Sequence, residues 1–137
     1  MDEFLLEIIT PEKQFFKGMV QQITCQTSDG ELGILKGHQT MVAALEIGQI
    51  SIKAEGEWKT AFISVGFMEV RRDEVVIFTQ TCEWPEEIDA ARAEEAKKRA
   101  LDHIKHAQNI KEHRKNEISL ARAMARLKVK NSRKPNM

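Results

Sequence analysis

The residues best suited to chemistry are one carboxylate and four arginines in the second half of the chain, spaced as on two helices. The first group follows steps of three or four residues: Asp89, Arg92, Ala96 and Arg99. The second group is Arg122 and Arg126, four residues apart. Residues at this spacing share one face of a helix. If the two helices pair antiparallel, the four guanidinium groups converge.

Converging guanidinium groups repel one another unless an anion lies between them. The planar fork of arginine binds a pair of phosphate oxygens, so a phosphate-bearing ligand fits this cluster. Ordinary ion pairing is the other explanation, and four carboxylates are near enough in the sequence to neutralise the arginines: Glu83, Glu87, Asp89 and Glu95. Both interpretations stay open at this point.

Other candidate chemistry in the chain is weak. The glycine-rich stretch 30–38 is no phosphate-binding loop, because that loop needs Gly-Lys-Ser/Thr and here Gly37 is followed by His38-Gln39-Thr40. His38 has no nucleophile near it at a recognisable spacing, so we expect it to bond backbone groups in a turn. His103 and His106 lack the carboxylate or cysteine that would complete a metal site. We predict no catalytic residue, no metal site and no enzyme activity.

The first 85 residues have the pattern of an all-β sandwich or barrel. Apolar residues alternate in short runs that end at turn signals, such as the Asp29-Gly30 hairpin signal and Glu55-Gly56-Glu57. The expected strands are centred on segments 4–8, 23–27, 50–54, 58–62, 68–70 and 75–79. Each strand lays one face on a shared core, so residues 1–85 are predicted to form a β-sandwich domain.

Residues 86–137 are predicted to form an antiparallel two-helix hairpin. Between residues 86 and 134 there is no Gly, Pro or aromatic residue. Pro85 and the acidic residues after it are typical of a helix start, so we expect helices over 86–107 and 112–130. Apolar residues recur at helical spacing, in the second helix at Ile118, Ala121, Ala125 and Leu127. Nine of the hairpin's apolar residues are alanines, which predicts a thin seam and a hairpin of marginal stability by itself.

Charge is divided between the two parts of the chain. The whole chain has 21 basic and 21 acidic residues, but residues 1–85 carry a net charge of −6 and the remainder carries +6. This division excludes a uniformly basic nucleic-acid binder. A transmembrane helix is excluded too, because the longest uncharged run, 18–28, has 11 residues. Cys25 and Cys82 are expected to be reduced structural thiols. The basic hairpin has no aromatic residue, so we expect no lipid insertion.

Several motifs together resemble the epsilon subunit of the bacterial F-type ATP synthase over nearly the full chain. The matching segments are Thr10-Pro11-Glu12, Asp29 to Leu35 followed by Gly37-His38, Val42 to Leu45, Gly66 to Val70 and Ala121 to Val129. The resemblance implies a β-sandwich and a two-helix hairpin. It also implies a non-catalytic central-stalk subunit, peripheral on the cytoplasmic face of the bacterial cell membrane.

The resemblance further implies partners and a mechanism. The sandwich is expected to bind the gamma subunit and the membrane rotor ring, and so to couple proton flow to ATP synthesis. The hairpin is expected to fold down on the sandwich, or to extend toward the beta and alpha subunits of the catalytic head and inhibit ATP hydrolysis. Nucleic acid is not an expected partner.

Segment 88–93 matches the Ile/Leu-Asp-x-x-Arg-Ala pattern at which some bacterial members bind ATP. The resemblance implies an ATP site made of Glu83, Ile88, Asp89, Arg92, Ala93, Arg99, Arg122 and Arg126. We hypothesise that the arginines surround the phosphates, that Glu83 and Asp89 face the nucleoside, and that ATP stabilises the folded-down hairpin. No cofactor is required, ATP is a regulatory ligand, and a role for magnesium stays open. The alternative function is a free-standing adaptor whose basic hairpin binds nucleic acid.

Overall fold

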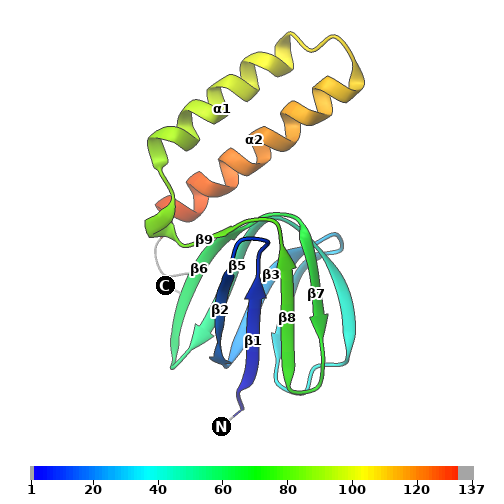
Figure 1. Ribbon diagram of the computed structural model, residues 1–137, viewed down its shortest axis with the longest axis vertical. Helices are drawn as coiled ribbons and strands as arrows, with labels where there is room; N and C mark the ends of the chain where they lie inside the picture. Colours follow the sequence, from blue (N-terminus) through cyan, green and yellow to red (C-terminus); the bar gives the residue numbers. More distant parts are fainter. Residues whose placement is uncertain (1, 133–137) are drawn as a thin grey trace.

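The computed structural model describes residues 2–132, which form a two-layer β-sandwich followed by a helical hairpin (Figure 1). The strands are β1 Phe4–Ile9, β2 Gln14–Val20, β3 Gln22–Thr27, β4 Gly30–Leu35, β5 Met41–Ala54, β6 Glu57–Ile63, β7 Gly66–Val70, β8 Glu74–Thr79 and β9 Cys82–Glu83. A short 3₁₀ turn, Pro85–Glu87, leads to α1 Ala90–Lys105 and α2 Ile110–Asn131. Both the sandwich and the hairpin agree with the fold predicted from the sequence.

Strand β5 joins the two layers of the sandwich. Its first part, 41–45, pairs with β7, which continues the layer β2-β1-β8-β7. Its second part, 48–54, pairs with β6 on one side and with β3 on the other. All strand pairs are antiparallel except β1 with β8, which is parallel. Strand β9 pairs with the end of β6 and brings Glu83 to the edge of the second layer.

The core of the sandwich comes from alternate residues of the strands. In β1 the buried residues are Phe4, Leu6 and Ile8. In β8 they are Val75, Ile77 and Thr79, and a more exposed residue separates each buried residue from the next in both strands. A strand places successive side chains on opposite faces, so this alternation puts one face of each layer on the shared core. Each fully buried aliphatic side chain contributes about 1.5–3 kcal/mol by leaving water.

Both predicted turns form, although the first lies one residue earlier than the Asp29-Gly30 signal places it. Ser28 and Asp29 connect β3 to β4, whose ends pair at Thr27 and Gly30. Glu55 and Gly56 connect β5 to β6 with φ values of 53° and 77°. Positive φ at both central residues is the geometry of a tight hairpin turn. Gly66 matters for another reason: a side chain there would collide with the backbone of Phe78.

Three strands were not predicted from the pattern: β2, β4 and β9. In strand β2 apolar and polar residues do not alternate, and only Val20 is fully buried, so the strand lacks the period-two pattern. In β4 the two glycines, Gly30 and Gly33, leave no apolar side chain at their positions. The short β9 has two residues and exists only through its pairing with β6.

The first helix begins later than predicted, at Ala90 and not at Glu86. Pro85 starts the 3₁₀ turn, and Ile88 and Asp89 then adopt extended backbone angles. Asp89 is the N-cap of α1, since its side chain accepts a hydrogen bond of 3.1 Å from the backbone N–H of Arg92. A carboxylate at this position satisfies a helix N–H that has no partner within the helix. The second helix begins at Ile110, two residues before its predicted start.

The seam between the helices is made of alanines, as predicted: Ala93 and Ala100 of α1 and Ala123 of α2 are buried. The predicted apolar face of the second helix was partly wrong. Ile118 is 47% exposed and Ala121 is exposed, because the buried residues are Ala123 and, near the sandwich, Val129.

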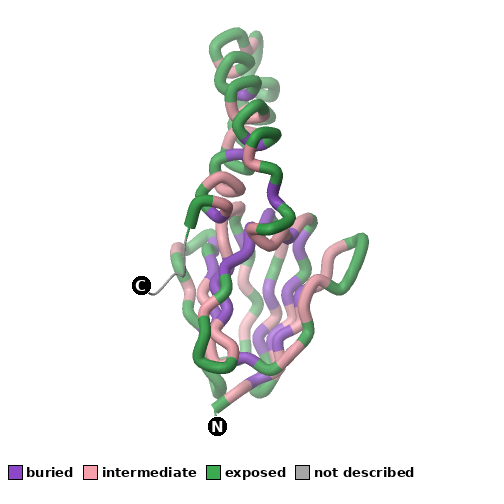
Figure 2. The backbone as a smooth tube through the Cα atoms, turned by 90° about the vertical axis from the view of Figure 1, so that its left-hand side faces the viewer, coloured by how far each residue is buried: buried purple, intermediate pink, exposed green. Residues whose placement is uncertain are grey.

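The hairpin stands on one end of the sandwich and points away from it (Figures 1 and 2). Only its base touches the strands, where α2 contacts β5 and β6. Phe62, Ile88 and Val129 form a buried cluster there, with Ile47 and Ala125 packed around it. Lys130 adds a hydrogen bond of 2.9 Å from Nζ to the carbonyl oxygen of Pro85. The predicted hairpin domain extends to residue 137, and residues 133–137 lie outside the described part.

No helix within residues 2–132 is long and apolar enough to cross a membrane.

Candidate functional site

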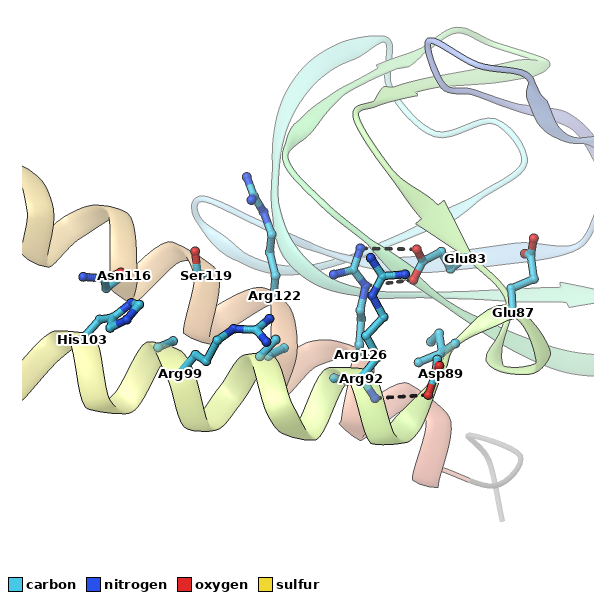
Figure 3. Close-up of a pocket in the computed structure, with 15 residues that line it drawn as sticks. Glu83, Glu87, Asp89, Arg92, Arg99, His103, Asn116, Ser119, Arg122 and Arg126 are labelled. Atoms are coloured by element: carbon cyan, nitrogen blue, oxygen red, sulfur yellow. Dashed lines mark hydrogen bonds and ion pairs between the residues drawn. The ribbon is translucent and has the colours of Figure 1, made fainter.

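A pocket of about 540 Å³ lies where β9, the 3₁₀ turn and the two helices meet (Figure 3). All eight residues of the predicted site line it: Glu83, Ile88, Asp89, Arg92, Ala93, Arg99, Arg122 and Arg126. The antiparallel pairing of the helices brings the two arginine groups together, as their spacing indicated. The structure thus places the predicted residues around one space, although only Glu83 comes from the sandwich.

Arg126 is the most constrained of the four arginines. Its Nε and Nη2 atoms donate to the two carboxylate oxygens of Glu83, at 2.9 and 3.3 Å. Its guanidinium carbon lies 4.6 Å from the centroid of the Phe62 ring. The side chains of Arg126 and Glu83 are 30% and 26% exposed, so this ion pair is half-buried and less screened than a surface pair.

The other three pocket arginines, Arg92, Arg99 and Arg122, are exposed. Within residues 2–132 no carboxylate forms an ion pair with any of them. The nearby carboxylates have other partners: Asp89 caps α1, and Glu87 accepts from the backbone N–H of Trp84 and pairs with Lys13. Neutralisation by ion pairs therefore accounts for Arg126 alone.

The pocket has both polar and apolar lining residues, and its carboxylates lie together at one end. Glu83, Glu87 and Asp89 lie at the end next to the 3₁₀ turn, the hinge between the sandwich and the hairpin. Arg99 and Arg122 lie further along the helices (Figure 3). Such a pocket offers carboxylate acceptors at one end and guanidinium donors in the middle. It suits an elongated ligand that has hydrogen-bond donors on one part and phosphate oxygens on another.

Further residues line the pocket that the sequence-based site did not include: Glu87, Ala96, Ala100, His103, Asn116, Ser119 and Ala123. His103, Asn116 and Ser119 form its far end (Figure 3). The sequence held a signal for these three residues, because His103 continues the helical steps of Arg92 and Arg99. Asn116 and Ser119 continue the steps of Arg122 and Arg126 in the same way.

His38 and the two cysteines do not line this pocket and have structural roles or surroundings elsewhere. His38 Nδ1 lies 2.9 Å from the carbonyl oxygen of Gln39, so this histidine bonds the backbone of its turn as predicted. Cys25 and Cys82 are free thiols, both buried, which confirms their expected state. In the described part of the chain, no three side chains among His, Cys, Asp and Glu are grouped so as to hold a metal ion.

Two family models match the chain, one on each part. The model described as "ATP synthase, Delta/Epsilon chain, beta-sandwich domain" matches residues 3–85. The model described as "ATP synthase, Delta/Epsilon chain, long alpha-helix domain" matches residues 86–131.

Curated relatives and solved structures agree with these matches. The ATP synthase epsilon chain of Caldanaerobacter subterraneus is 46% identical over 127 residues, 92% of each chain. That of Ruminiclostridium cellulolyticum is 41% identical over 134 residues, which cover 98% of this chain and all of the relative. A chain in the cryo-EM structure of the Euglena gracilis mitochondrial ATP synthase, OSCP/F1/c-ring, has a TM-score of 0.81 and 26% identity, covering 91% of this chain and 79% of that one. A chain of the Tetrahymena thermophila central stalk and c-ring has a TM-score of 0.68 at 15% identity, with coverage of 93% and 96%, and shares the fold.

Proposed function

We infer the function from the family: this chain belongs to the delta/epsilon chains of ATP synthase, and it is an epsilon-type subunit of the central stalk. We propose that it is a non-catalytic subunit of a bacterial proton-translocating enzyme, where it couples rotation to ATP synthesis and regulates ATP hydrolysis. The observation that carries this proposal is the match of both domains, in order, over residues 3–131. The proposed location is the cytoplasmic face of the cell membrane, as a peripheral protein.

The sandwich is proposed to bind the gamma subunit and the membrane rotor ring. Exposed apolar side chains on the sandwich support a protein partner: Val42 is 70% exposed, and the tilted rings of Phe67 and Phe78 lie with their centroids 5.2 Å apart on the surface. Large exposed apolar groups of this kind mark contact surfaces. The Euglena structure that holds a similar chain includes the c-ring, which fits the same proposal.

The hairpin is proposed to move between two positions. In the described conformation it touches the sandwich only at its base, and its inner seam buries alanines, so little apolar area holds it in place. Released, its excess of basic side chains would meet an acidic surface of the beta and alpha subunits of the catalytic head. That contact is proposed to inhibit ATP hydrolysis.

The pocket is proposed to bind ATP, with the phosphates toward the arginines and the nucleoside toward Glu83 and Asp89. Three exposed arginines without a carboxylate partner in the described chain support an anionic ligand. Because Glu83 belongs to the sandwich and the arginines belong to the hairpin, the complete pocket exists only when the hairpin is docked. A ligand that binds one state stabilises it, by about 2.7 kcal/mol at a hundredfold excess over Kd. ATP is therefore expected to hold the hairpin down.

Calorimetry of the full chain with ATP tests this site. We expect a saturable heat for the unaltered chain and at least a tenfold weaker Kd for Arg92→Ala combined with Arg126→Ala, since phosphate loses two charged partners. Arg71→Ala is the matched control, because Arg71 is an exposed arginine paired with Glu69 and Glu74 on the sandwich. No saturable heat at millimolar ATP, or equal binding by the double variant, would overturn the proposed site.

A further inference from the structure

Phe62 lies at the point where the sandwich, the hairpin and the pocket meet. It lies on β6 and is fully buried. Its strand neighbour Ala61 faces the sandwich core, so Phe62 is buried on the opposite face of the strand. Phe62 instead belongs to the docking cluster with Ile88 before α1 and Val129 on α2. This aromatic ring is thus covered by the hairpin and not by the second layer of the sandwich.

The same ring supports Arg126. The guanidinium carbon of Arg126 lies over the ring, 4.6 Å from its centroid. Phe62 is also the register partner of Glu83 in the pairing of β6 with β9. Opposing residues of an antiparallel pair lie close together on one face of the sheet. One cross-strand pair therefore holds Arg126 through two contacts, the aromatic ring and the carboxylate.

We propose that Phe62 positions Arg126 and thereby couples the pocket to docking of the hairpin. A cation–π contact strengthens when its surroundings exclude water, and Arg126 is half-buried here. When the hairpin leaves the sandwich, Arg126 loses the ring and Glu83 together, because both stay on the strands. The inference rests on the proposed nucleotide binding for its effect on ATP, while the contact between Phe62 and Arg126 stands without a ligand.

The consequence for ligand binding is preorganisation. An arginine side chain free in solution samples many rotamers, and ordering it on binding costs free energy. With the guanidinium already held by Phe62, a phosphate ligand avoids much of that cost. Removing the ring is therefore expected to weaken ATP binding even though Phe62 does not line the pocket.

A double-mutant cycle on the full chain isolates this contact. The variants are Phe62→Leu, which keeps an apolar side chain without the ring, Arg126→Gln, and the combination of both. The first measurement is hydrogen-exchange protection of the α2 amides near residue 126, without nucleotide. We expect the loss of protection caused by F62L to be about threefold to tenfold smaller in the R126Q background, which lies between the values for an exposed and a desolvated cation–π contact.

Val129→Ala is the matched control for packing. Val129 belongs to the same docking cluster but does not line the pocket. Val129→Ala removes packing alone, so we expect it to lower protection by the same factor with and without R126Q. Circular dichroism checks that each variant folds, and Phe62→Met replaces F62L if the latter does not.

The second measurement is the ATP affinity of the same variants. We expect F62L to weaken the Kd about threefold to tenfold and to have little further effect in the R126Q background. If the unaltered chain binds no ATP, the proposed site fails while the exchange cycle still decides the role of Phe62. Independent, multiplying effects of F62L and R126Q on protection would overturn the inference.

Discussion

Burial changes the acidity of both cysteines, Cys25 and Cys82. Removal from water, with a smaller effect of neighbouring glutamates, raises the pKa of the Cys25 thiol to about 11 and that of the Cys82 thiol to about 12. The thiolate is the reactive form of cysteine. Near pH 8 the native chain is therefore expected to react with iodoacetamide much more slowly than the urea-unfolded chain. Equal rates of alkylation in the two states would contradict this account.

The same pKa shifts predict how stability depends on pH. The folded-state pKa lies above the ordinary value of 9.0, so the stability from these thiols is complete below about pH 9 and decreases as the pH rises toward 11. Each thiol contributes at most about 1.4 kcal/mol per pH unit in that window. Urea unfolding at pH 8 and pH 10.5 measures the loss. A chain with Cys25→Ala and Cys82→Ala is the control and should lose less stability over this interval.

Gln49 of β5 is a partly buried residue whose side-chain oxygen, Oε1, is itself buried. It is the register partner of Phe62, so the two side chains share a face, and its Oε1 atom has no hydrogen-bond partner in the described chain. A buried unsatisfied acceptor costs about 1–3 kcal/mol. Gln49→Met is therefore expected to raise the free energy of unfolding by about 1 kcal/mol. An unchanged or lower urea midpoint would show that Oε1 already has a partner.

At the residue scale, the arginines of the pocket could be predicted from the sequence, but the contact that holds Arg126 in place could not. Arg92, Arg99, Arg122 and Arg126 were found because helical spacing and antiparallel pairing fix their relative positions. The contact of Arg126 with Phe62 joins residues 64 positions apart on different domains. Nothing in local spacing indicates which strand meets α2. Such contacts follow only from how the hairpin docks.

At the element scale, the N-caps of the two helices offer a matched comparison. Asp89 caps α1 at the hinge, and Asn109 caps α2 at the far end of the hairpin through a 2.8 Å bond from the N–H of Glu112. Loss of a cap costs about 1 kcal/mol. Asp89→Ala is expected to speed hydrogen exchange of the Arg92 amide several-fold, whereas Asn109→Ala should leave that amide unchanged. The reverse pattern would mean that the start of α1 is held by other contacts.

Elements with strong local signals were predictable, and elements that depend on a partner were not. The Asp29-Gly30 hairpin and the two helices follow from turn chemistry and helical spacing. Strand β9 forms only against β6, and the first helix starts late because Asp89 caps it after the 3₁₀ turn at Pro85. A proline followed by acidic residues fits a 3₁₀ turn as well as a helix start.

At the scale of the whole molecule, an acidic sandwich carries a basic hairpin on a small contact. The charges of −6 and +6 cancel in the docked chain, yet within residues 2–132 the ion pairs that join the strands to the hinge and helices are Arg126 with Glu83 and Lys13 with Glu87. Opposite charge draws the parts together without many specific bonds to hold them. Under the proposed function, a nucleotide or an acidic partner surface would therefore decide the position of the hairpin.

Removal of the hairpin from the assembled enzyme tests the central claim most directly. A chain that ends at Trp84 keeps every strand of the described sandwich and loses both helices. In an ATP synthase reconstituted with it, we expect assembly to persist and the rate of ATP hydrolysis to rise above that of the enzyme with the full chain. Hydrolysis at the same rate with the full and shortened chains would contradict the regulatory role of the hairpin.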